Sequence, residues 1–364
     1  MIPIANPEFG AREKDAVAEV LDGGRVADGP VVREFESEFA DFCGADHGVA
    51  TTNGTTALHT AFEALDIGEG DVVVTSPFSF VASANSIRFA GATPVFADID
   101  LATYNLDPAS TEKLVREHDA DAILAVHLFG LPADMARLRG IADEHDCALV
   151  EDAAQAHGAV HDGVRAGSLG DVACFSFYPT KNMTTGEGGM ITTDNEAVAE
   201  RAASFVNHGR AADRPAYEHV RVGHNFRMTS VLAAIGRVQF DRLPEYNESR
   251  RANAARLTEA LADAPGIHAP VEPPGTRHVY HQYTVRTADR GVLADHLEAE
   301  GVSSVVYYPK PIHFQPPYED SDVTAPAAEY AAESVLSVPV HPSLSNEDVA
   351  SVADALRSYE GGEQ

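Results

Sequence analysis

The stretch DVACFSFYPTKNMTTGEGG (Asp171–Gly189) decides how the rest of the chain is interpreted. It is apolar and β-prone over Val172–Phe177, breaks at a proline, and is followed by a second β-prone run, Met190–Thr193. Between the two runs lies Lys181, one of only four lysines in the chain. Because burial lowers the pKa of an ammonium group, a partly buried lysine here could attack a carbonyl. A solvated loop lysine beside a hairpin explains this stretch equally well on its own.

The composition is that of an ordered and strongly acidic globular protein. The 364 residues include 26 basic and 56 acidic side chains, which give a formal net charge of −30, and 44% of the residues are hydrophobic. A surface with this charge repels nucleic acids and anionic membranes, so the sequence predicts no partner of either kind. Scarce lysine and abundant acid also indicate a halophilic protein, because salt screens the repulsion among carboxylates.

The cysteines and the N-terminus point to the cytoplasm. Cys43, Cys147 and Cys174 are odd in number and lack a C-x-x-C spacing, which favours buried thiols in a reducing compartment. The first residues, MIPIANPEFG, lack the pattern of a signal peptide, and no apolar run reaches membrane-spanning length. We therefore expect a soluble cytoplasmic protein.

Strand-like and helix-like segments alternate from residue 47 to residue 151. The expected strands are short and apolar: Gly48–Thr51, Asp71–Thr75, Thr93–Ala97, Ala122–His127 and Ala148–Glu151. The expected helices before and between them are Ala11–Leu21, Pro30–Phe42, Thr55–Leu65, Ser79–Phe89, Asp107–Glu117 and Pro132–His145. This order predicts an α/β fold in which helices cover both faces of a mostly parallel sheet, a three-layer arrangement.

The last third of the chain has fewer expected strands relative to its helices than the preceding part. Its expected helices are Asn195–Asn207, Thr229–Phe240, Leu243–Leu261, Gly291–Glu300 and Ser345–Tyr359. Its expected strands are Val279–Arg286 and Ser303–Tyr307. We predict a large domain over residues 1–242 and a smaller C-terminal α+β domain over 243–364, which begins with a connecting helix.

An anion cradle is expected after the first strand, because ligands of parallel sheets bind at the carboxyl ends of the strands. The turn Asn53–Thr56 ends a strand and opens a helix, so its free backbone N–H groups and a threonine hydroxyl could hold an anion. An ordinary helix cap explains this turn almost as well.

Three further strand ends carry side chains suited to one cofactor. Glu151 and Asp152 end a β run, and a buried aspartate would keep a heteroaromatic nitrogen protonated, although a solvated helix start is the alternative. An aromatic ring of the Phe78–Phe80 run could stack on a planar ring or simply pack in the core. The Ser176 hydroxyl could meet a phosphate. With Lys181, these groups match the requirements of pyridoxal 5'-phosphate held as a Schiff base.

Long contiguous motifs then reveal a family resemblance. The runs EDAAQAHGA (Glu151–Ala159) and GSLGDVACFSFYPTKN (Gly167–Asn182) resemble the sugar-aminotransferase family often named DegT/DnrJ/EryC1/StrS, as do NGTTALH, PVFADID, GEGG, HNFRM and YYPKPIHFQP. The resemblance covers nearly the whole chain. It implies an aspartate-aminotransferase-like (PLP fold type I) homodimer that moves an amino group, usually from glutamate, to a keto group of a nucleotide-linked sugar.

The resemblance also implies roles for individual residues. Lys181 would be the Schiff-base lysine and proton shuttle, and Asp152 would pair with the pyridine nitrogen. Gln155 would meet the phenolic oxygen of the cofactor. Phe80 matches the position of the residue that stacks on the ring.

A second group matches phosphate and substrate binders of the family. Gly54, Thr55 and Ser176 correspond to phosphate-binding positions. Asn225 is expected to reach the phosphate from the neighbouring subunit, and Arg227 corresponds to a residue that holds the substrate or the amino donor.

The segment Val305–Pro317 is the candidate for substrate discrimination. Tyr307, Tyr308 and His313 lie in a proline-bounded loop, where binding residues are common, although packing in the small domain explains one tyrosine equally well. The form YYP-x-P-x-H is closer to relatives that act on 3-keto sugars than to those that act on 4-keto sugars. No histidine pair has the H-E-x-x-H pattern, so we expect no metal.

Three other functions remain possible at this point. A pyridoxal-phosphate-dependent sugar dehydratase would be expected to have lost Lys181, which this chain keeps. An aminotransferase for a non-sugar ketone would keep the same cofactor residues. A regulatory protein that binds the cofactor without turnover is the third alternative, but the chain carries no helix-turn-helix pattern and its charge disfavours DNA.

Overall fold

The central element is a seven-stranded sheet with strand order β1-β9-β8-β5-β4-β2-β3. The computed structural model describes residues 1–212, 214–215, 217–262, 264–319 and 323–359. The strands are β1 (His47–Thr51), β2 (Val72–Thr75), β3 (Thr93–Phe96), β4 (Ala122–Val126), β5 (Ala148–Asp152), β8 (Val172–Ser176) and β9 (Gly189–Thr193). Strand β9 runs antiparallel to both β1 and β8, and the other four pairings are parallel, so the prediction of a mostly parallel sheet is confirmed.

Helices cover both faces of this sheet because successive strand residues point into different cores. Val73 belongs to the core under α3 (Gly54–Ala64), whereas its neighbour Val74 belongs to the core under α6 (Met135–His145). The remaining covering helices are α2 (Pro30–Cys43), α4 (Ala82–Ala90), α5 (Pro108–His118) and α7 (Glu196–Val206). The result is the predicted three-layer α/β architecture.

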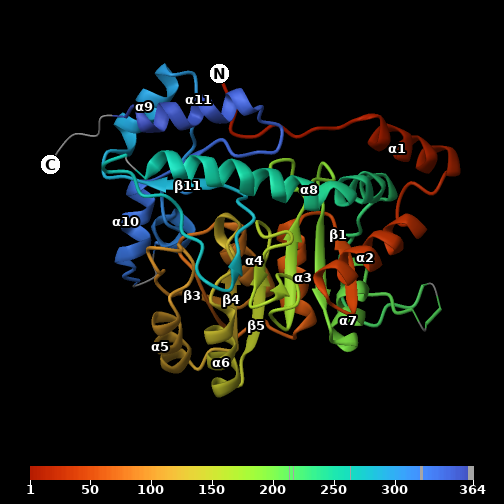
Figure 1. Cartoon of the computed structure of the whole chain (residues 1–364). Coiled ribbons are helices and arrows are strands. Elements are labelled where there is room, and N and C mark those ends of the chain that lie inside the picture. The colour runs from red at the N-terminus through yellow and green to blue at the C-terminus, as the bar shows by residue number, and fades with distance from the viewer. Residues whose placement is uncertain (213, 216, 263, 320–322, 360–364) are drawn as a thin grey trace.

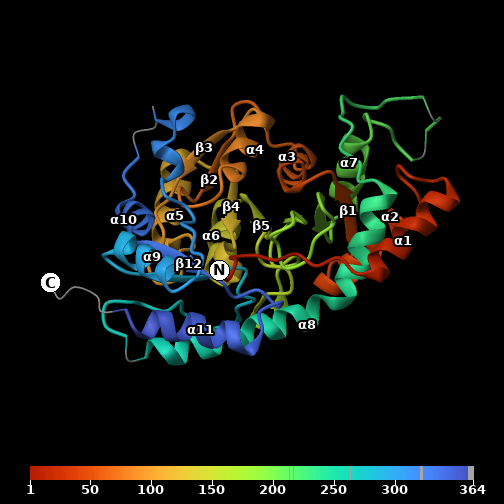
Figure 2. The same ribbon diagram turned by 90° about the horizontal axis from the view of Figure 1, so that it is seen from above.

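Helix α8 (Ser230–Leu261) runs as one continuous helix from the region of α2 to the C-terminal elements (Figures 1 and 2). The prediction of two separate helices, Thr229–Phe240 and Leu243–Leu261, is therefore wrong. Pro244 lies inside α8, where a proline costs about 3 kcal/mol. Burial of Leu243, Leu257 and Leu261 offsets this cost, because each buried leucine contributes about 1.5–3 kcal/mol.

The two ends of α8 belong to different cores. Leu243 packs with α2 and the large sheet, whereas Leu257 and Leu261 pack with the C-terminal elements. Helix α1 (Ala11–Gly23) lies beside the first end and α11 (Asn346–Arg357) beside the second. The predicted boundary between residues 242 and 243 falls inside this helix, and the division into two domains stays a prediction.

The C-terminal part is built on a two-stranded antiparallel sheet of β11 (Tyr283–Arg286) and β12 (Val335–Val338). Helices α9 (Arg290–Ala299) and α11 pack on it, as predicted, whereas α10 (Pro326–Ser334) and β12 were not predicted. The expected strand Ser303–Tyr307 is reduced to one bridge, between Val305 and Ser337.

The expected strand Val279–Arg286 begins only at Tyr283, because the preceding residues bind elsewhere. The N–H groups of Val279 and Gln282 donate to the carbonyls of Gly130 and Phe129 in η1 (Leu128–Gly130), which follows β4. This diversion brings residues 278–282 to the edge of the large sheet. Just before residues 278–282 in the chain, β10 (Thr276–Arg277) pairs with β6 (Val160–His161) and, with β7 (Val164–Arg165), completes a small three-stranded sheet.

Two general expectations can also be compared with the fold. Cys43, Cys147 and Cys174 are buried and free, as expected. Among the described residues, no helix is both long and apolar enough to cross a bilayer.

Candidate active site

A cavity of about 880 Å³ lies at the carboxyl ends of the parallel strands. It collects most of the side chains that the sequence singled out: Gly54, Thr55, Phe80, Asp152, Gln155, Ser176, Lys181, Tyr307 and Tyr308. These residues come from segments that follow β1, β2, β5 and β8, and from the loop before η2 (Ile312–Phe314). The parallel sheet therefore brings together residues that are up to 254 positions apart in the sequence.

Lys181 lies in a turn directly after β8, half-buried at the cavity wall. Its own N–H donates to the carbonyl of Tyr178 at 2.9 Å, and the neighbouring Asn182 side chain donates to Asn247 Oδ1 of α8 at 2.8 Å. Burial lowers the pKa of Lys181 to about 8, although the negative charge of Asp152 opposes that shift. At neutral pH, about a tenth of the amines would then be unprotonated and nucleophilic.

Asp152, the last residue of β5, is a buried carboxylate in the cavity wall. Its Oδ2 accepts a hydrogen bond from Ser83 Oγ at 2.7 Å, and its Oδ1 accepts one from Ala154 N at 3.3 Å. Burial raises the pKa of Asp152, while these two hydrogen bonds and the charge of Lys181 act in the opposite direction. Two hydrogen bonds leave a carboxylate with further capacity to accept from a cationic N–H.

Glu151, the preceding residue, points to the other face of the sheet and does not line the cavity. Its Oε2 accepts from His127 Nε2 and from Gly167 N, each at 2.9 Å. Its Oε1 accepts from the N–H groups of Leu169 and Gly170, each at 2.8 Å. The two carboxylates end the same strand, but Glu151 has a structural position and binds the turn that precedes β8.

Gln155 is held in one orientation by two neighbours. Its Oε1 accepts from Phe129 N at 2.7 Å, and its Nε2 donates to the Tyr308 hydroxyl at 3.2 Å. An amide nitrogen carries two hydrogens, so a second donor remains for a ligand in the cavity. Phe80, which is 57% exposed, lies with its ring centroid 6.2 Å from that of Tyr308, and the two rings form an aromatic wall.

The first turn of α3 has free backbone N–H groups that fit the expected anion cradle. The Asn53 side chain accepts from Thr56 N at 2.9 Å and its carbonyl accepts from Ala57 N, so this cap does not use the N–H groups of Gly54 and Thr55. A Cβ on Gly54 would come within 2.8 Å of Ser176 Cβ, so only glycine allows this approach. Exposed N–H groups at a helix N-terminus beside a serine hydroxyl fit a phosphate.

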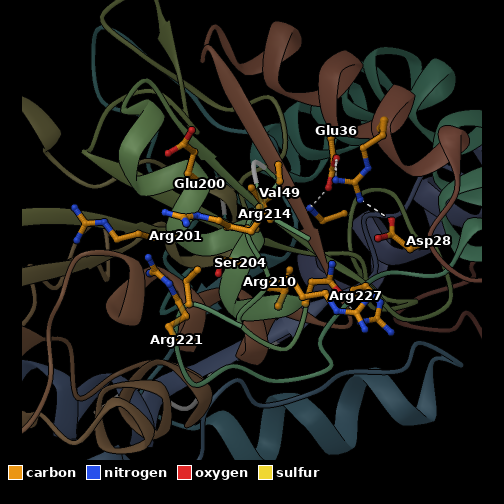
Figure 3. Close-up of a pocket in the computed structure, with 18 residues that line it drawn as sticks. Asp28, Glu36, Val49, Glu200, Arg201, Ser204, Arg210, Arg214, Arg221 and Arg227 are labelled. Carbon is orange, nitrogen blue, oxygen red and sulfur yellow. Dashed lines mark hydrogen bonds and ion pairs between the residues drawn. The ribbon is translucent and has the colours of Figure 1, made fainter. Parts of the chain in front are cut away.

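Asn225 and Arg227 lie outside this cavity. Arg227 lines a second pocket of about 690 Å³ between α2, β1, α7 and residues 207–212 and 220–227 (Figure 3), and it donates to Asn207 Oδ1 at 2.6 Å. Asn225 is exposed and forms a bridge with Asn207. Arginine dominates the charged lining of this second pocket, with Arg33, Arg201, Arg210, Arg214, Arg221 and Arg227.

His313 is also absent from the cavity lining. It is 3% exposed, and its Nε2 lies 3.4 Å from Glu329 Oε1, on the side of α10. The structure thus gives His313 a packing environment. Among the described residues, no group of three or more histidine, cysteine, aspartate or glutamate side chains could hold a metal ion.

Several residues of the site had no recognisable signal in the sequence. Phe129, His281 and Gln282 line the cavity. The last two do so because residues 278–282 bind Phe129 and Gly130 and do not extend β11. Ser83 reaches Asp152 from α4, and only its helical i, i+4 spacing to Ser79 could have pointed to it.

Comparisons with known proteins agree with this geometry. The profile of the DegT/DnrJ/EryC1/StrS aminotransferase family matches residues 7–357. The dTDP-3-amino-3,4,6-trideoxy-alpha-D-glucose transaminase of Streptomyces venezuelae is 40% identical over 359 residues, which cover 98% of this chain and 94% of that protein. The "Pleiotropic regulatory protein" of Geobacillus stearothermophilus is 40% identical over 347 residues, covering 94% and 92%.

A solved structure shares the whole fold. The crystal structure of S. venezuelae DesV superposes with a TM-score of 0.92 at 41% sequence identity, and the match covers 95% of this chain and 94% of that one. The predicted fold class is therefore confirmed.

Proposed function

Because this chain belongs to the DegT/DnrJ/EryC1/StrS aminotransferase family, we propose that it moves an amino group from glutamate to a keto group of a nucleotide-linked sugar. The cofactor would be pyridoxal 5'-phosphate, and 2-oxoglutarate would be the second product. The name of the S. venezuelae relative, which specifies a 3-amino sugar, supports the expectation of a 3-keto substrate. The reaction would serve amino-sugar or polysaccharide biosynthesis.

The observation that carries this proposal is the meeting of Lys181, Asp152 and the α3 cradle in one cavity. Bound pyridoxal 5'-phosphate would supply a carbonyl for Lys181 and a protonated ring that takes up the electrons of a breaking C–H bond. The first N–H groups of α3, with Ser176 Oγ, would hold its phosphate. Asp152 would keep the ring nitrogen protonated through a charge-assisted hydrogen bond.

The other cavity residues would orient and protect the reacting centre. Gln155 would donate to the phenolic oxygen, and Phe80 would cover one face of the ring. Lys181 would hold the cofactor and would act as the general base that takes the proton from the donor Cα, since a lowered pKa suits a general base. The two half-reactions share one site, so ping-pong kinetics are expected.

The size of the cavity fits a cofactor together with a sugar. A volume of about 880 Å³ is near the upper end of the range for small-molecule sites, roughly 300–1,000 Å³. Tyr307 and Tyr308, at the cavity wall, are the proposed contacts of the sugar.

The first experiment is an absorbance spectrum of the protein purified in high salt, before and after addition of glutamate. We expect a band of the bound cofactor near the edge of the visible range that is replaced by a band at shorter wavelength, with one 2-oxoglutarate formed per site. A protein that shows no such band after incubation with pyridoxal 5'-phosphate would contradict the proposal.

A regulatory role is the second candidate, because the relative from G. stearothermophilus is named as a regulatory protein. The same spectrum distinguishes the two functions. If the protein binds the cofactor but converts no glutamate at any glutamate concentration, the result would favour regulation without turnover. A sugar dehydratase is disfavoured because Lys181 is retained.

We also propose a homodimer whose sites are shared between subunits. Asn225 and Arg227 lie outside the Lys181 cavity of their own chain, which supports a contribution to the partner's site. Mixing Lys181→Ala with Asn225→Ala subunits tests this directly, because each heterodimer would regain one complete site. Random pairing would restore about a quarter of the wild-type activity, whereas sites confined to one chain would leave the mixture as inactive as its components.

We further propose that the protein works in the cytoplasm of a salt-adapted cell. The three buried free cysteines support a reducing compartment, and the net charge of −30 supports high salt. Melting temperature should therefore rise with KCl concentration from 0.1 M to 3 M.

A further inference from the structure

Two serine hydroxyls form a line that ends on Asp152. Ser83 Oγ lies 2.7 Å from Asp152 Oδ2, and Ser79 Oγ lies 2.8 Å from Ser83 Oγ. Ser83 is fully buried, and Ser79 and Asp152 are only 5% and 6% exposed. Ser79 lines the cavity, whereas Ser83 does not and touches Asp152 from behind.

The chemistry of the groups sets the direction of both hydrogen bonds. An ionised carboxylate can only accept, so Ser83 must donate its single hydrogen to Asp152. Ser83 can then only accept in its contact with Ser79, which must be the donor. Both dipoles therefore point their positive ends toward the carboxylate, and the outer bond strengthens the inner one. A protonated Oδ2 would accept the Ser83 hydrogen bond more weakly than the ionised oxygen does, so the line favours the charged form of Asp152.

The Ser83 hydrogen bond is the contact that most favours the ionised form of Asp152. Burial at the strand end disfavours the charge of Asp152, and the Ser83 bond is the largest of the contributions that oppose this effect. The second donor, Ala154 N, is more distant, at 3.3 Å. The Ser83 bond occupies Oδ2 on the α4 side, and it thereby limits rotation of the carboxylate and leaves the remaining lone pairs for the cavity.

We propose that Ser83, supported by Ser79, is a positioning residue that keeps the Asp152 carboxylate ionised and directed at the ring nitrogen of the bound cofactor. The inference rests on the proposed function, because it concerns the same site. It also explains why one short segment, residues 79–83, carries both the ring-facing Phe80 and the support of the carboxylate on which that ring depends.

The test replaces the hydroxyls one at a time in the complete protein. The variants are Ser83→Ala, Ser79→Ala and Ser83→Thr, with Ser86→Ala as the matched control. Ser86 is equally buried on the same helix, but its hydroxyl bonds to the carbonyl of Ser83 at 2.9 Å and not to Asp152. Each variant is loaded with pyridoxal 5'-phosphate that carries ¹⁵N in the ring, and the ¹⁵N chemical shift is followed from pH 6 to pH 9.5.

In Ser83→Ala, the ring nitrogen should lose its proton about one pH unit lower than in the wild type, a tenfold weaker hold on the proton. Ser79→Ala should move the titration in the same direction by a smaller amount, and Ser83→Thr should restore it. Ser86→Ala should titrate like the wild type. We also expect kcat to fall about tenfold in Ser83→Ala with little change in KM, because the ring charge matters most in the transition state.

Two results would overturn the inference: an unchanged ¹⁵N titration in Ser83→Ala, or an equal displacement in Ser86→Ala. If Ser83→Ala does not fold, Ser79→Ala decides the question, since its hydroxyl acts only through Ser83 in this line. Failure of the wild-type protein to bind the labelled cofactor would contradict the proposed function instead, so the two failures are distinguishable.

Discussion

At the end of β5, two neighbouring carboxylates lie on opposite faces of the sheet and differ in how many of their hydrogen-bond acceptor positions are used within the chain. On the closed face, Glu151 accepts four hydrogen bonds, two at each oxygen, from His127 and from three backbone N–H groups between residues 167 and 170. On the cavity face, Asp152 accepts two, from Ser83 and Ala154. The side chains are one position apart and both are buried.

The difference shows how the end of one strand can both stabilise the fold and bind a ligand. Every acceptor site of Glu151 is used within the chain, so it ties the turn before β8 to the sheet and has no capacity for a ligand. Asp152 keeps capacity on the side where Lys181 lies. Removing groups on the cavity face should therefore reduce activity, whereas removing groups on the closed face should reduce stability.

The largest effect is expected from Lys181→Ala on the cavity face. Turnover of glutamate with a keto sugar should fall by about 10⁴-fold or more, because the nucleophile and the proton carrier are lost together. The melting temperature should stay within a few degrees of the wild type. Lys113→Ala, which removes an exposed lysine of α5, is the control and should keep full activity. Full turnover in Lys181→Ala would refute the assignment.

Asp152→Asn should lower kcat by roughly 10²–10⁴-fold, since a neutral amide does not hold the ring nitrogen protonated. Stability should change little or increase, because the variant removes a buried charge whose hydration was lost on folding. Steady-state kinetics and thermal unfolding of the same sample measure both quantities. A large loss of stability in Asp152→Asn would contradict the expectation that the cavity face serves activity and the closed face serves stability.

Glu151→Gln should show the opposite pattern. Either orientation of the amide places an NH₂ group against two N–H donors, which leaves buried donors unsatisfied and costs about 3–5 kcal/mol of unfolding free energy. Denaturant unfolding checks this value. The folded fraction should lose far less kcat than Asp152→Asn does, and an equal loss would mean that Glu151 also takes part in the chemistry.

The smallest effect concerns the pH at which the cavity becomes reactive. Because the pKa of Lys181 is lowered to about 8, its neutral amine appears as the pH rises through 8. The rate at which cofactor-free protein combines with pyridoxal 5'-phosphate should rise over this interval and level off above it. Asp152→Asn removes the charge that opposes the shift, so its midpoint should be lower. A rate that still climbs at pH 10 would show that Lys181 behaves as an ordinary lysine.

Much of the fold was predictable because helices and strands depend on local patterns. The alternation from β1 to β5, the hairpin strands β8 and β9, and helices such as α5 with its Asp107 cap followed the expected periods and caps. The errors occurred where distant contacts outweigh local preference. Pro244 did not end α8, and residues 278–282 left their expected strand to bind Phe129 and Gly130.

By itself, the sequence determined the parallel sheet, the family, and the side chains that meet at its carboxyl edge, because strand ends in such a sheet share one edge whatever the loops do. Only the tertiary structure decided which of the two adjacent carboxylates has all its hydrogen-bond acceptor positions occupied and which can still bind a ligand. That choice depends on donors from residues 127 and 167–170 on one face and from Ser83 on the other. Hydrogen-bond saturation is a property of three-dimensional neighbours, and no local pattern around Glu151 and Asp152 encodes it.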